Sequence, residues 1–148
     1  MKYFAYGSNM DPDQMRVRGA PFTDRMFAVL RGYALKFNKK TTAKGAKPGE
    51  GKGNVVCDPK GQAEGALYEI TSEGLKKLDM REKGYYRVEL WVELKDGSGQ
   101  KAWVYIAEPE KVQDGLKPSC EYLHHYLRGR DLLSQKYYEW LEDTETID

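Results

Sequence analysis

The clearest pattern of hydrophobic and polar positions lies between residues 85 and 107. Over Tyr85–Lys95, four apolar residues alternate with charged residues and Trp91, and this two-residue period is typical of a half-buried strand. The turn-forming residues Asp96–Gly99 come next, and Lys101–Ala107 again places apolar side chains on every second position. The pattern predicts a hairpin of two antiparallel strands.

Strand-forming residues also dominate four earlier segments. These segments are Lys2–Tyr6, Met26–Phe37, Val55–Cys57 and Glu64–Ile70. Gly32 interrupts the second segment, where a bulge or a close backbone approach is expected. Asp58–Gly61 is a strong turn signal that should separate the last two strands.

Four segments have the pattern of capped helices. Pro12–Arg18 follows a possible Asp11 cap, a second helix follows Thr71 or Ser72, a third runs from Ser119 through Leu127, and a fourth runs from Ser134 through Leu141. Helices and strands together predict an α+β class. The sheet should be mostly antiparallel and could curl into a barrel, with the helices laid on it.

Composition narrows the function classes. The 148 residues favour one domain, and a net charge of +1 gives no reason to expect a nucleic-acid or membrane partner. No segment has the length of a membrane span or the pattern of a signal peptide, so a cytoplasmic location is expected. Cys57 and Cys120 do not form a disulfide framework. Adjacent His124 and His125 diverge on a helix, so a metal site is not expected.

Residues 38–54 form a basic segment without apolar periodicity. Five lysines and one glutamate lie in it. The glycine spacing does not match a phosphate-binding loop, and the aromatic and arginine side chains common in nucleic-acid-binding arms are missing. A flexible surface loop is predicted, in a position that would allow it to act as a lid.

The first candidate site follows the opening strand. Tyr6, Gly7, Ser8, Asn9 and Met10 form a turn that leads into the helix start at Asp11 and Pro12. Backbone N–H groups, a hydroxyl and an amide would converge there, as they do in sites that hold a carboxylate or another anion. From the residues alone, an ordinary turn between a strand and a helix is the favoured interpretation, since such turns are common.

Glu82 is the second candidate. Leu75 and Leu78 define the buried stripe of the second predicted helix, and the next position on that stripe is Glu82. Burial near the C-terminal end of a helix would raise the pKa of this carboxyl, as a general base near neutral pH requires. Alternatively, the helix ends early and Glu82 points to water or pairs with Arg81 or Arg87.

Other nucleophilic sites have little support. Ser8 lacks the second glycine of a nucleophile elbow, and no histidine–aspartate arrangement accompanies it. A cysteine nucleophile with a histidine base could be formed by Cys57 or Cys120 with His124 or His125. The spacing of these residues in the sequence does not support such a pair.

Three motifs resemble the γ-glutamylcyclotransferase family. The run Tyr3–Met10 resembles the N-terminal signature of that family, and Leu78–Tyr86 resembles its segment with an essential glutamate before a strand. Pro118–Tyr122, followed by Gly129 and Leu133–Tyr138, more loosely resembles its C-terminal region. Lys83 and the lysine-rich segment depart from the family pattern. These departures bear on which substrate is used more than on the fold.

The resemblance implies a small β-barrel flanked by helices that needs no cofactor and no metal. The implied reaction is an intramolecular aminolysis of a γ-glutamyl amide, which releases 5-oxoproline and an amine or amino acid. Glu82 would transfer the proton. The implied substrate-binding residues are Tyr6, Gly7, Ser8, Asn9, Met10, Asp11 and Tyr122.

The sequence leaves several alternatives open. The enzyme could act on another γ-glutamyl amine or on a γ-glutamylated biosynthetic intermediate, and a protein that binds such ligands without turnover is a different class. A nucleic-acid-associated protein that uses Lys39–Lys52 is a third hypothesis. The sequence does not decide between a monomer and a homodimer.

Overall fold

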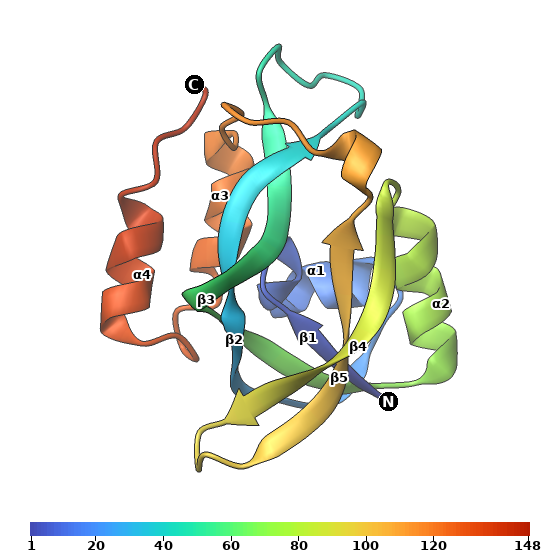
Figure 1. The fold of residues 1–148 in the computed structure, drawn as a ribbon. Helices are drawn as coiled ribbons and strands as arrows, with labels where there is room; N and C mark the ends of the chain where they lie inside the picture. Colours follow the sequence, from blue (N-terminus) through green and yellow to red (C-terminus); the bar gives the residue numbers. More distant parts are fainter.

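The computed structural model describes all 148 residues and contains a closed barrel of five strands (Figure 1). The strands are β1 (Lys2–Ala5), β2 (Phe22–Lys40), β3 (Gly51–Ile70), β4 (Tyr85–Leu94) and β5 (Gly99–Ala107). Their order around the barrel is β1-β3-β2-β4-β5, and all neighbours are antiparallel except β5 and β1, which are parallel where Trp103 meets Tyr3. The prediction of an α+β fold with a mixed, mostly antiparallel barrel is confirmed.

The two long strands β2 and β3 correct one sequence prediction. Asp58–Gly61 does not separate two strands, because β3 continues through it. The partners of β2 shift from Gln62 to Cys57 across Gly32, so residues 58–61 form a bulge opposite a single glycine. Gly32 has a φ of +83°, which an L-residue side chain rarely allows. The hydrogen bond expected of an aspartate in a turn does form within the bulge, since the Lys60 N–H donates to Asp58 Oδ1 at 3.0 Å.

The basic segment 38–54 is shorter as a loop than predicted. Pairing of Lys39 with Lys52 and of Lys40 with Gly51 extends β2 and β3 into it, so that residues 41–50 form the connection. A strand ladder is held by main-chain hydrogen bonds, which need no apolar side chains. Glycines in this part of β3 also leave space for side chains from a helix, as described below.

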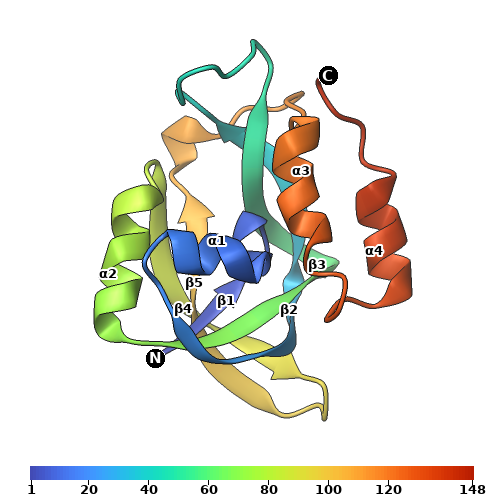
Figure 2. The same cartoon turned by 180° about the vertical axis from the view of Figure 1, so that it is seen from behind.

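Four α-helices and two 3-10 turns cover the outside of the barrel (Figure 2). They are η1 (Ser8–Met10), α1 (Pro12–Val17), α2 (Ser72–Arg81), η2 (Pro109–Lys111), α3 (Cys120–Leu127) and α4 (Gln135–Glu142). Helices α3 and α4 lie side by side on one side, α2 lies on the other, and α1 lies between them. No helix is both long enough and apolar enough to cross a bilayer.

Each α-helix begins at a predicted cap. The side chains of Asp11, Thr71, Ser119 and Ser134 accept hydrogen bonds from backbone N–H groups in the first turn of their helices. These bonds satisfy donors that have no partner inside the helix. The caps therefore fix where each helix starts relative to the strand before it.

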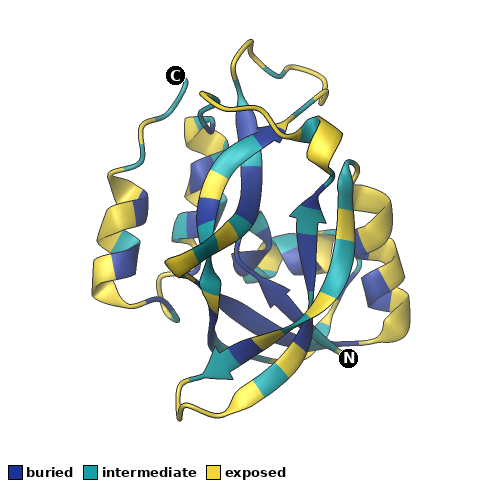
Figure 3. Ribbon diagram, in the orientation of Figure 1, coloured by how far each residue is buried: buried dark blue, intermediate teal, exposed yellow.

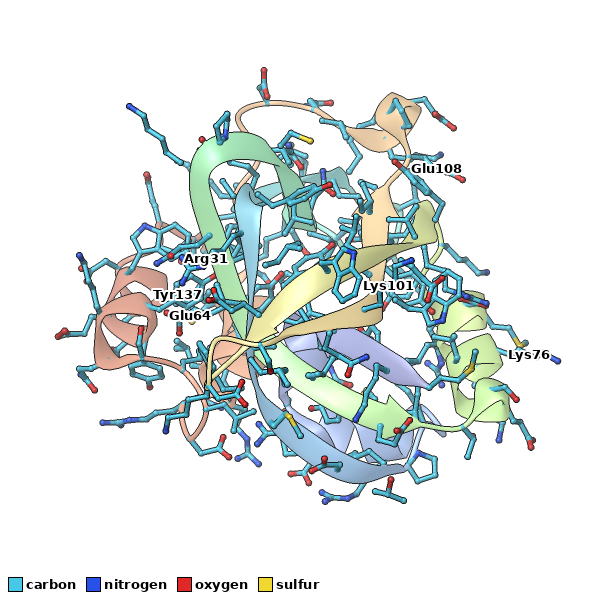
Figure 4. The ribbon with its side chains drawn as sticks, turned by 60° about the horizontal axis from the view of Figure 1, so that its bottom comes forward. Arg31, Glu64, Lys76, Lys101, Glu108 and Tyr137 are labelled. Atoms are coloured by element: carbon cyan, nitrogen blue, oxygen red, sulfur yellow. The ribbon has the colours of Figure 1, made fainter.

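The buried residues fill the barrel and the seams under the helices (Figure 3). Leu75 and Leu78 of α2, Tyr126 of α3 and Leu141 of α4 are almost fully buried. One buried carboxylate fastens α4 to the barrel. Glu64 of β3 accepts hydrogen bonds from the Ser134 N–H at 2.8 Å and from the Ser134 hydroxyl at 2.7 Å. Figure 4 shows Glu64 next to Tyr137 of α4.

Candidate active site

The turn after β1 is the first part of the site. Gly7 leads into η1, whose hydrogen bonds run from the Met10 N–H to Gly7 O and from the Asp11 N–H to Ser8 O. The N–H groups of Ser8 and Asn9 therefore have no acceptor within this turn. A Cβ at Gly7 would lie 3.1 Å from the Tyr126 hydroxyl, so close packing favours glycine at this position.

Glu82 lies beside the same turn. Helix α2 ends at Arg81, and Glu82 is its C-cap, with its N–H donating to Leu78 O at 2.9 Å. Gly84, with a φ of +84°, then turns the chain into β4. The helix thus ends one residue before Glu82, yet the carboxylate does not point freely to water, because its side chain is only 18% exposed.

Two polar side chains approach the Glu82 carboxylate. Asn9 Nδ2 donates to Glu82 Oε1 at 3.3 Å and to the Tyr3 hydroxyl at 2.9 Å. Arg18 NH1 donates to Asn9 Oδ1 at 2.8 Å and lies 3.8 Å from Glu82 Oε1. The amide of Asn9 is therefore held by Arg18 and aimed at the carboxylate, which connects the turn to Glu82 across 73 residues of sequence.

Burial raises the pKa of Glu82 above its ordinary value. The positive charges of Arg18 and Lys39 and the hydrogen bond from Asn9 oppose this effect without cancelling it. A carboxylate with a raised pKa is a stronger base than an exposed one. Burial thus makes Glu82 a candidate proton acceptor.

Tyrosines form another part of the site, the tyrosine wall of Tyr85, Tyr122 and Tyr126. The Tyr85 hydroxyl donates to Gly53 O at 2.7 Å, and the Gly53 N–H donates to the Tyr122 hydroxyl at 2.9 Å. The hydroxyl groups of Tyr122 and Tyr126 lie 2.9 Å apart, and burial raises the pKa of Tyr122 to about 12, so it stays protonated. A Cβ at Gly53 would lie only 1.9 Å from the Tyr126 hydroxyl. The glycine is needed for this close approach.

A cavity lies between the turn, Glu82 and the tyrosine wall. Its lining residues come from four strands, the first turn, the C-terminal end of α2 and α3: Tyr3, Phe4, Tyr6, Gly7, Ser8, Asn9, Gly53, Glu82, Tyr85, Tyr105 and Tyr122. Six of the residues expected at the site, Tyr6, Gly7, Ser8, Asn9, Glu82 and Tyr122, are among them. Tyr6 also supports the wall, since its hydroxyl donates to Tyr105 O at 2.6 Å.

Two of the residues expected at the site do not line the cavity. The Met10 side chain is fully buried and packs against Gly129. Asp11 caps α1 and lies 2.9 Å from His125 Nδ1. Burial acts to raise the pKa of Asp11, but the hydrogen bonds from His125 and Asp13 and the charge of Arg128 lower it overall. Both residues shape the turn from behind.

The sequence did not single out several residues of the site. Gly53 was placed in a loop, and Tyr3, Tyr85 and Tyr105 belong to strands whose tyrosines gave no sign of facing a cavity. Arg18 lies at the end of a short helix and has no motif around it. Polar residues at the ends of the predicted strands were possible neighbours of Glu82. The sequence does not show which of them approach Glu82, because that depends on the register between the strands.

A larger cavity, of about 180 Å³, lies elsewhere on the barrel, between β2, β3 and β4. Three of its four charged side chains already have partners: Arg31 binds Glu93 and Gln62, and Glu64 binds Ser134. No group of three or more histidine, cysteine, aspartate or glutamate side chains could hold a metal ion. The chemistry therefore points to the cavity at Glu82.

A family model matches most of the chain, and solved structures share its fold. Residues 3–124 match the family model described as gamma-glutamyl cyclotransferase, AIG2-like. The solved structure of the human uncharacterized protein loc79017 has a TM-score of 0.86 and 24% identity, over 99% of this chain and 89% of that one. A structure described as gamma-glutamyl cyclotransferase has a TM-score of 0.85 with the same identity and coverage.

A third structure, YkqA from Bacillus subtilis, has a TM-score of 0.81 and 25% identity, over 99% of this chain and 55% of YkqA. No curated protein sequence matches the chain. The matched family segment includes the turn at Gly7, Glu82 and Tyr122, which meet at one cavity. The protein therefore belongs to the AIG2-like gamma-glutamyl cyclotransferase family.

Proposed function

We propose that this protein converts a γ-glutamyl amide into 5-oxoproline and releases the amine or amino acid that was bound to the γ-carbonyl. The observation that supports this most is the contact between the two candidate sites. Glu82, at the end of α2, receives a hydrogen bond from Asn9 of the turn, at the edge of one cavity. A ring closure by an internal amine needs one base, a grip on the glutamyl unit and no further reagent.

The reaction is an attack of the substrate's own α-amine on its γ-carbonyl carbon. A new C–N bond closes the five-membered lactam, and the bond to the leaving nitrogen breaks. The attacking nitrogen loses one proton and the leaving nitrogen gains one. A single carboxylate that accepts the first proton and returns it to the leaving nitrogen balances the reaction.

Glu82 suits this role for reasons of position and environment. Its carboxylate lies at the cavity, and burial raises its pKa. The positive charge of the nearby Arg18 opposes this rise in pKa, because it favours the ionised carboxylate. In the proposed cycle, Glu82 is ionised before the attack, protonated in the intermediate and ionised again after the leaving amine departs.

The turn at Gly7 would hold the glutamyl α-carboxylate. The N–H groups of Ser8 and Asn9 have no acceptor within η1, and the Ser8 side chain is part of the cavity lining. An anion held there would lie next to Asn9, whose amide also contacts Glu82. This arrangement would bring the α-amine of the same glutamyl unit towards the base.

The experiment that tests the proposal is an assay of 5-oxoproline release from a series of donors. The series should include γ-glutamyl amino acids, γ-glutamyl alkylamines and γ-glutamyl-ε-lysine, each with its released amine measured in parallel. We expect equal amounts of 5-oxoproline and free amine from at least one donor. Tight binding of these donors without any 5-oxoproline would instead identify a ligand-binding protein and would rule out the enzyme.

A further inference from the structure

Arg25 and Tyr68 lie side by side behind the turn at Gly7. They are direct partners in the ladder of β2 and β3, and directly opposed residues project to the same face of a sheet. Tyr68 is fully buried, and the Arg25 side chain is only 11% exposed. Neither residue lines the cavity at Glu82. Any effect of this pair on a ligand in the cavity therefore passes through the turn.

The Arg25 guanidinium donates four hydrogen bonds. Two of them hold it to Asp131, from NH1 to Oδ2 at 2.6 Å and from NH2 to Oδ1 at 3.2 Å. NH2 also donates to Met10 O at 2.9 Å, and Nε donates to the Tyr68 hydroxyl at 3.3 Å. A planar guanidinium with this many partners has a fixed orientation. Asp131 thus fixes the arginine, and the arginine fixes the carbonyl of Met10.

The Tyr68 hydroxyl holds the carbonyl one residue earlier. It accepts the hydrogen bond from Arg25 and donates its own proton to Asn9 O at 2.7 Å. Burial raises the pKa of Tyr68 to about 12, although the hydrogen bond from Arg25 opposes this effect, so the hydroxyl remains a donor at neutral pH. The pair therefore holds two successive carbonyls of the turn.

Two chains of hydrogen-bonded peptide groups lead from this pair to the cavity. In a trans peptide group the C=O and the N–H point in opposite directions, so a bond to the carbonyl fixes where the N–H points. The Tyr68 hydroxyl holds Asn9 O, and the N–H of that peptide group, from Met10, donates to Gly7 O at 3.0 Å. Gly7 O shares its peptide group with the N–H of Ser8. The first chain thus ends on the Ser8 N–H.

The second chain starts at Arg25. Its NH2 holds Met10 O, and the N–H of that peptide group, from Asp11, donates to Ser8 O at 3.2 Å. Ser8 O shares its peptide group with the N–H of Asn9. Both chains therefore end on N–H groups that have no acceptor within η1, on two residues that line the cavity. Hydrogen bonds in such a chain polarise one another, which strengthens the last donor.

We propose that Arg25 and Tyr68 are positioning residues, which aim the N–H groups of Ser8 and Asn9 at the α-carboxylate of the substrate without touching it. This inference rests on the proposed cyclotransferase function, which assigns the glutamyl carboxylate to this turn. Donors that are already oriented bind an anion more tightly than donors that the ligand must first order. The pair thus contributes to recognition of the α-carboxylate and not to recognition of the leaving group.

Two ligands that differ only in the α-carboxylate test the proposal. 4-Aminobutanoyl-L-alanine is γ-glutamyl-L-alanine without that carboxylate. Both are titrated by calorimetry into Glu82→Gln, which should bind them without turnover, and the ratio of their Kd values measures the contribution of the carboxylate. We expect γ-glutamyl-L-alanine to bind about a hundredfold more tightly, the effect of two hydrogen bonds to a charged group.

Changes at the pair should reduce this ratio. Arg25→Met, added to Glu82→Gln, removes the start of one chain and a partner of the other, so the ratio should fall by about tenfold. Tyr68→Phe removes only the hydroxyl, and the ratio should fall by about threefold. Because phenylalanine keeps the buried ring, Tyr68→Phe also tests the proposal if Arg25→Met does not fold. A purely structural role would weaken the binding of both ligands together and would cancel in the ratio.

Arg31→Met and Tyr137→Phe are the matched controls. Arg31 lies on the same strand as Arg25 and pairs with Glu93, and the Tyr137 hydroxyl is buried on α4. Neither side chain is hydrogen-bonded to the turn, so both variants should keep the ratio of Glu82→Gln.

Each outcome has a distinct meaning. A ratio that falls in Arg25→Met or Tyr68→Phe, but not in the controls, supports the positioning role. A ratio that is unchanged in both variants, or that falls equally in the controls, overturns that role while the carboxylate site at the turn stands. Equal affinities for the two ligands in Glu82→Gln itself overturn the carboxylate site and the positioning role together.

The cyclotransferase function is tested separately, by 5-oxoproline release from the wild-type protein in the donor series described above. If no donor yields 5-oxoproline, the proposed function fails whatever the ratio is, and the role of Arg25 and Tyr68 in that reaction fails with it.

Discussion

Two carboxylates that are largely shielded from solvent, Glu64 on β3 and Glu82 at the end of α2, have opposite surroundings. Glu64 is 6% exposed, and each of its oxygens accepts a short hydrogen bond from Ser134 at the start of α4. Glu82 receives one longer hydrogen bond, from Asn9 at 3.3 Å, and its nearest cation, Arg18, lies 3.8 Å away. Figure 4 shows Glu64 at the seam with α4, whereas Glu82 lies at the cavity.

The difference separates a structural carboxylate from a reactive one. A buried charge that is fully hydrogen-bonded holds two elements together, and its removal leaves its partners unsatisfied. A buried charge with few partners is poorly stabilised, so its pKa rises and it can exchange a proton with a ligand. Burial alone therefore does not identify the active site of this protein, but burial with incomplete hydrogen bonding does.

The largest expected effect is the loss of turnover in Glu82→Gln. Glutamine keeps the size of the side chain but cannot accept the proton, so kcat for 5-oxoproline release should fall by about a thousandfold or more. The fold should be retained, as measured by circular dichroism and by an unchanged affinity for a γ-glutamyl ligand. Retention of most of the activity would exclude Glu82 as the base.

The matched change at the other carboxylate, Glu64→Gln, should affect stability and not chemistry. The glutamine amide group would face one of the two Ser134 donors, so one buried hydrogen bond is lost, at a cost of about 1–3 kcal/mol in the free energy of unfolding. Urea denaturation measures this loss, and kcat of the folded protein should stay within about twofold of the wild type. A large fall in kcat without a loss of stability would contradict the assignment of Glu64 as a structural carboxylate and Glu82 as the reactive one.

A smaller effect is expected from Asn9→Ala, which removes the hydrogen bond to Glu82. The bond favours the ionised carboxylate, so its loss should raise the pKa of Glu82 further. The acidic limb of the pH profile of kcat/KM should move to higher pH, with a rate at neutral pH about tenfold lower. If the limb stays at its wild-type position while the rate falls, Asn9 acts on the substrate and not on the base.

The smallest expected effect is on the pH dependence of stability. Because the pKa of Glu82 is raised in the folded state, the unfolded chain releases this proton at lower pH than the folded protein does. Glu82 therefore destabilises the fold increasingly as the pH rises from the ordinary glutamate pKa through the raised one. Glu82→Gln should gain stability relative to the wild type over that range, measured by urea denaturation at several pH values. A difference that does not change with pH would contradict the raised pKa.

The sequence predicted most of the fold because the decisive signals were local. The alternation over Tyr85–Lys95 is a property of the strand itself, and the caps at Asp11, Thr71, Ser119 and Ser134 act within one helical turn. The interpretation of Asp58–Gly61 as the end of a strand was wrong for the opposite reason. Pairing with β2 on both sides of the bulge outweighs the local turn preference.

The site was less predictable because its parts meet only through strand register. Asn9 and Glu82 carried local signals, in a turn sequence and in a charged residue on an apolar stripe. Gly53 carried none, because its importance comes from the space that the Tyr126 hydroxyl occupies. The sequence also placed Lys39 in a surface loop with other lysines. In the structure it belongs to β2, and little of the residue is exposed.

The most direct test of the central claim is a crystal structure of Glu82→Gln with bound γ-glutamyl-L-alanine, which this variant should not convert. The glutamyl α-carboxylate should bind at the N–H groups of Ser8 and Asn9, with the α-amine about 3 Å from the side chain at position 82. An α-amine that points away from position 82, or a substrate bound outside this cavity, would contradict the account.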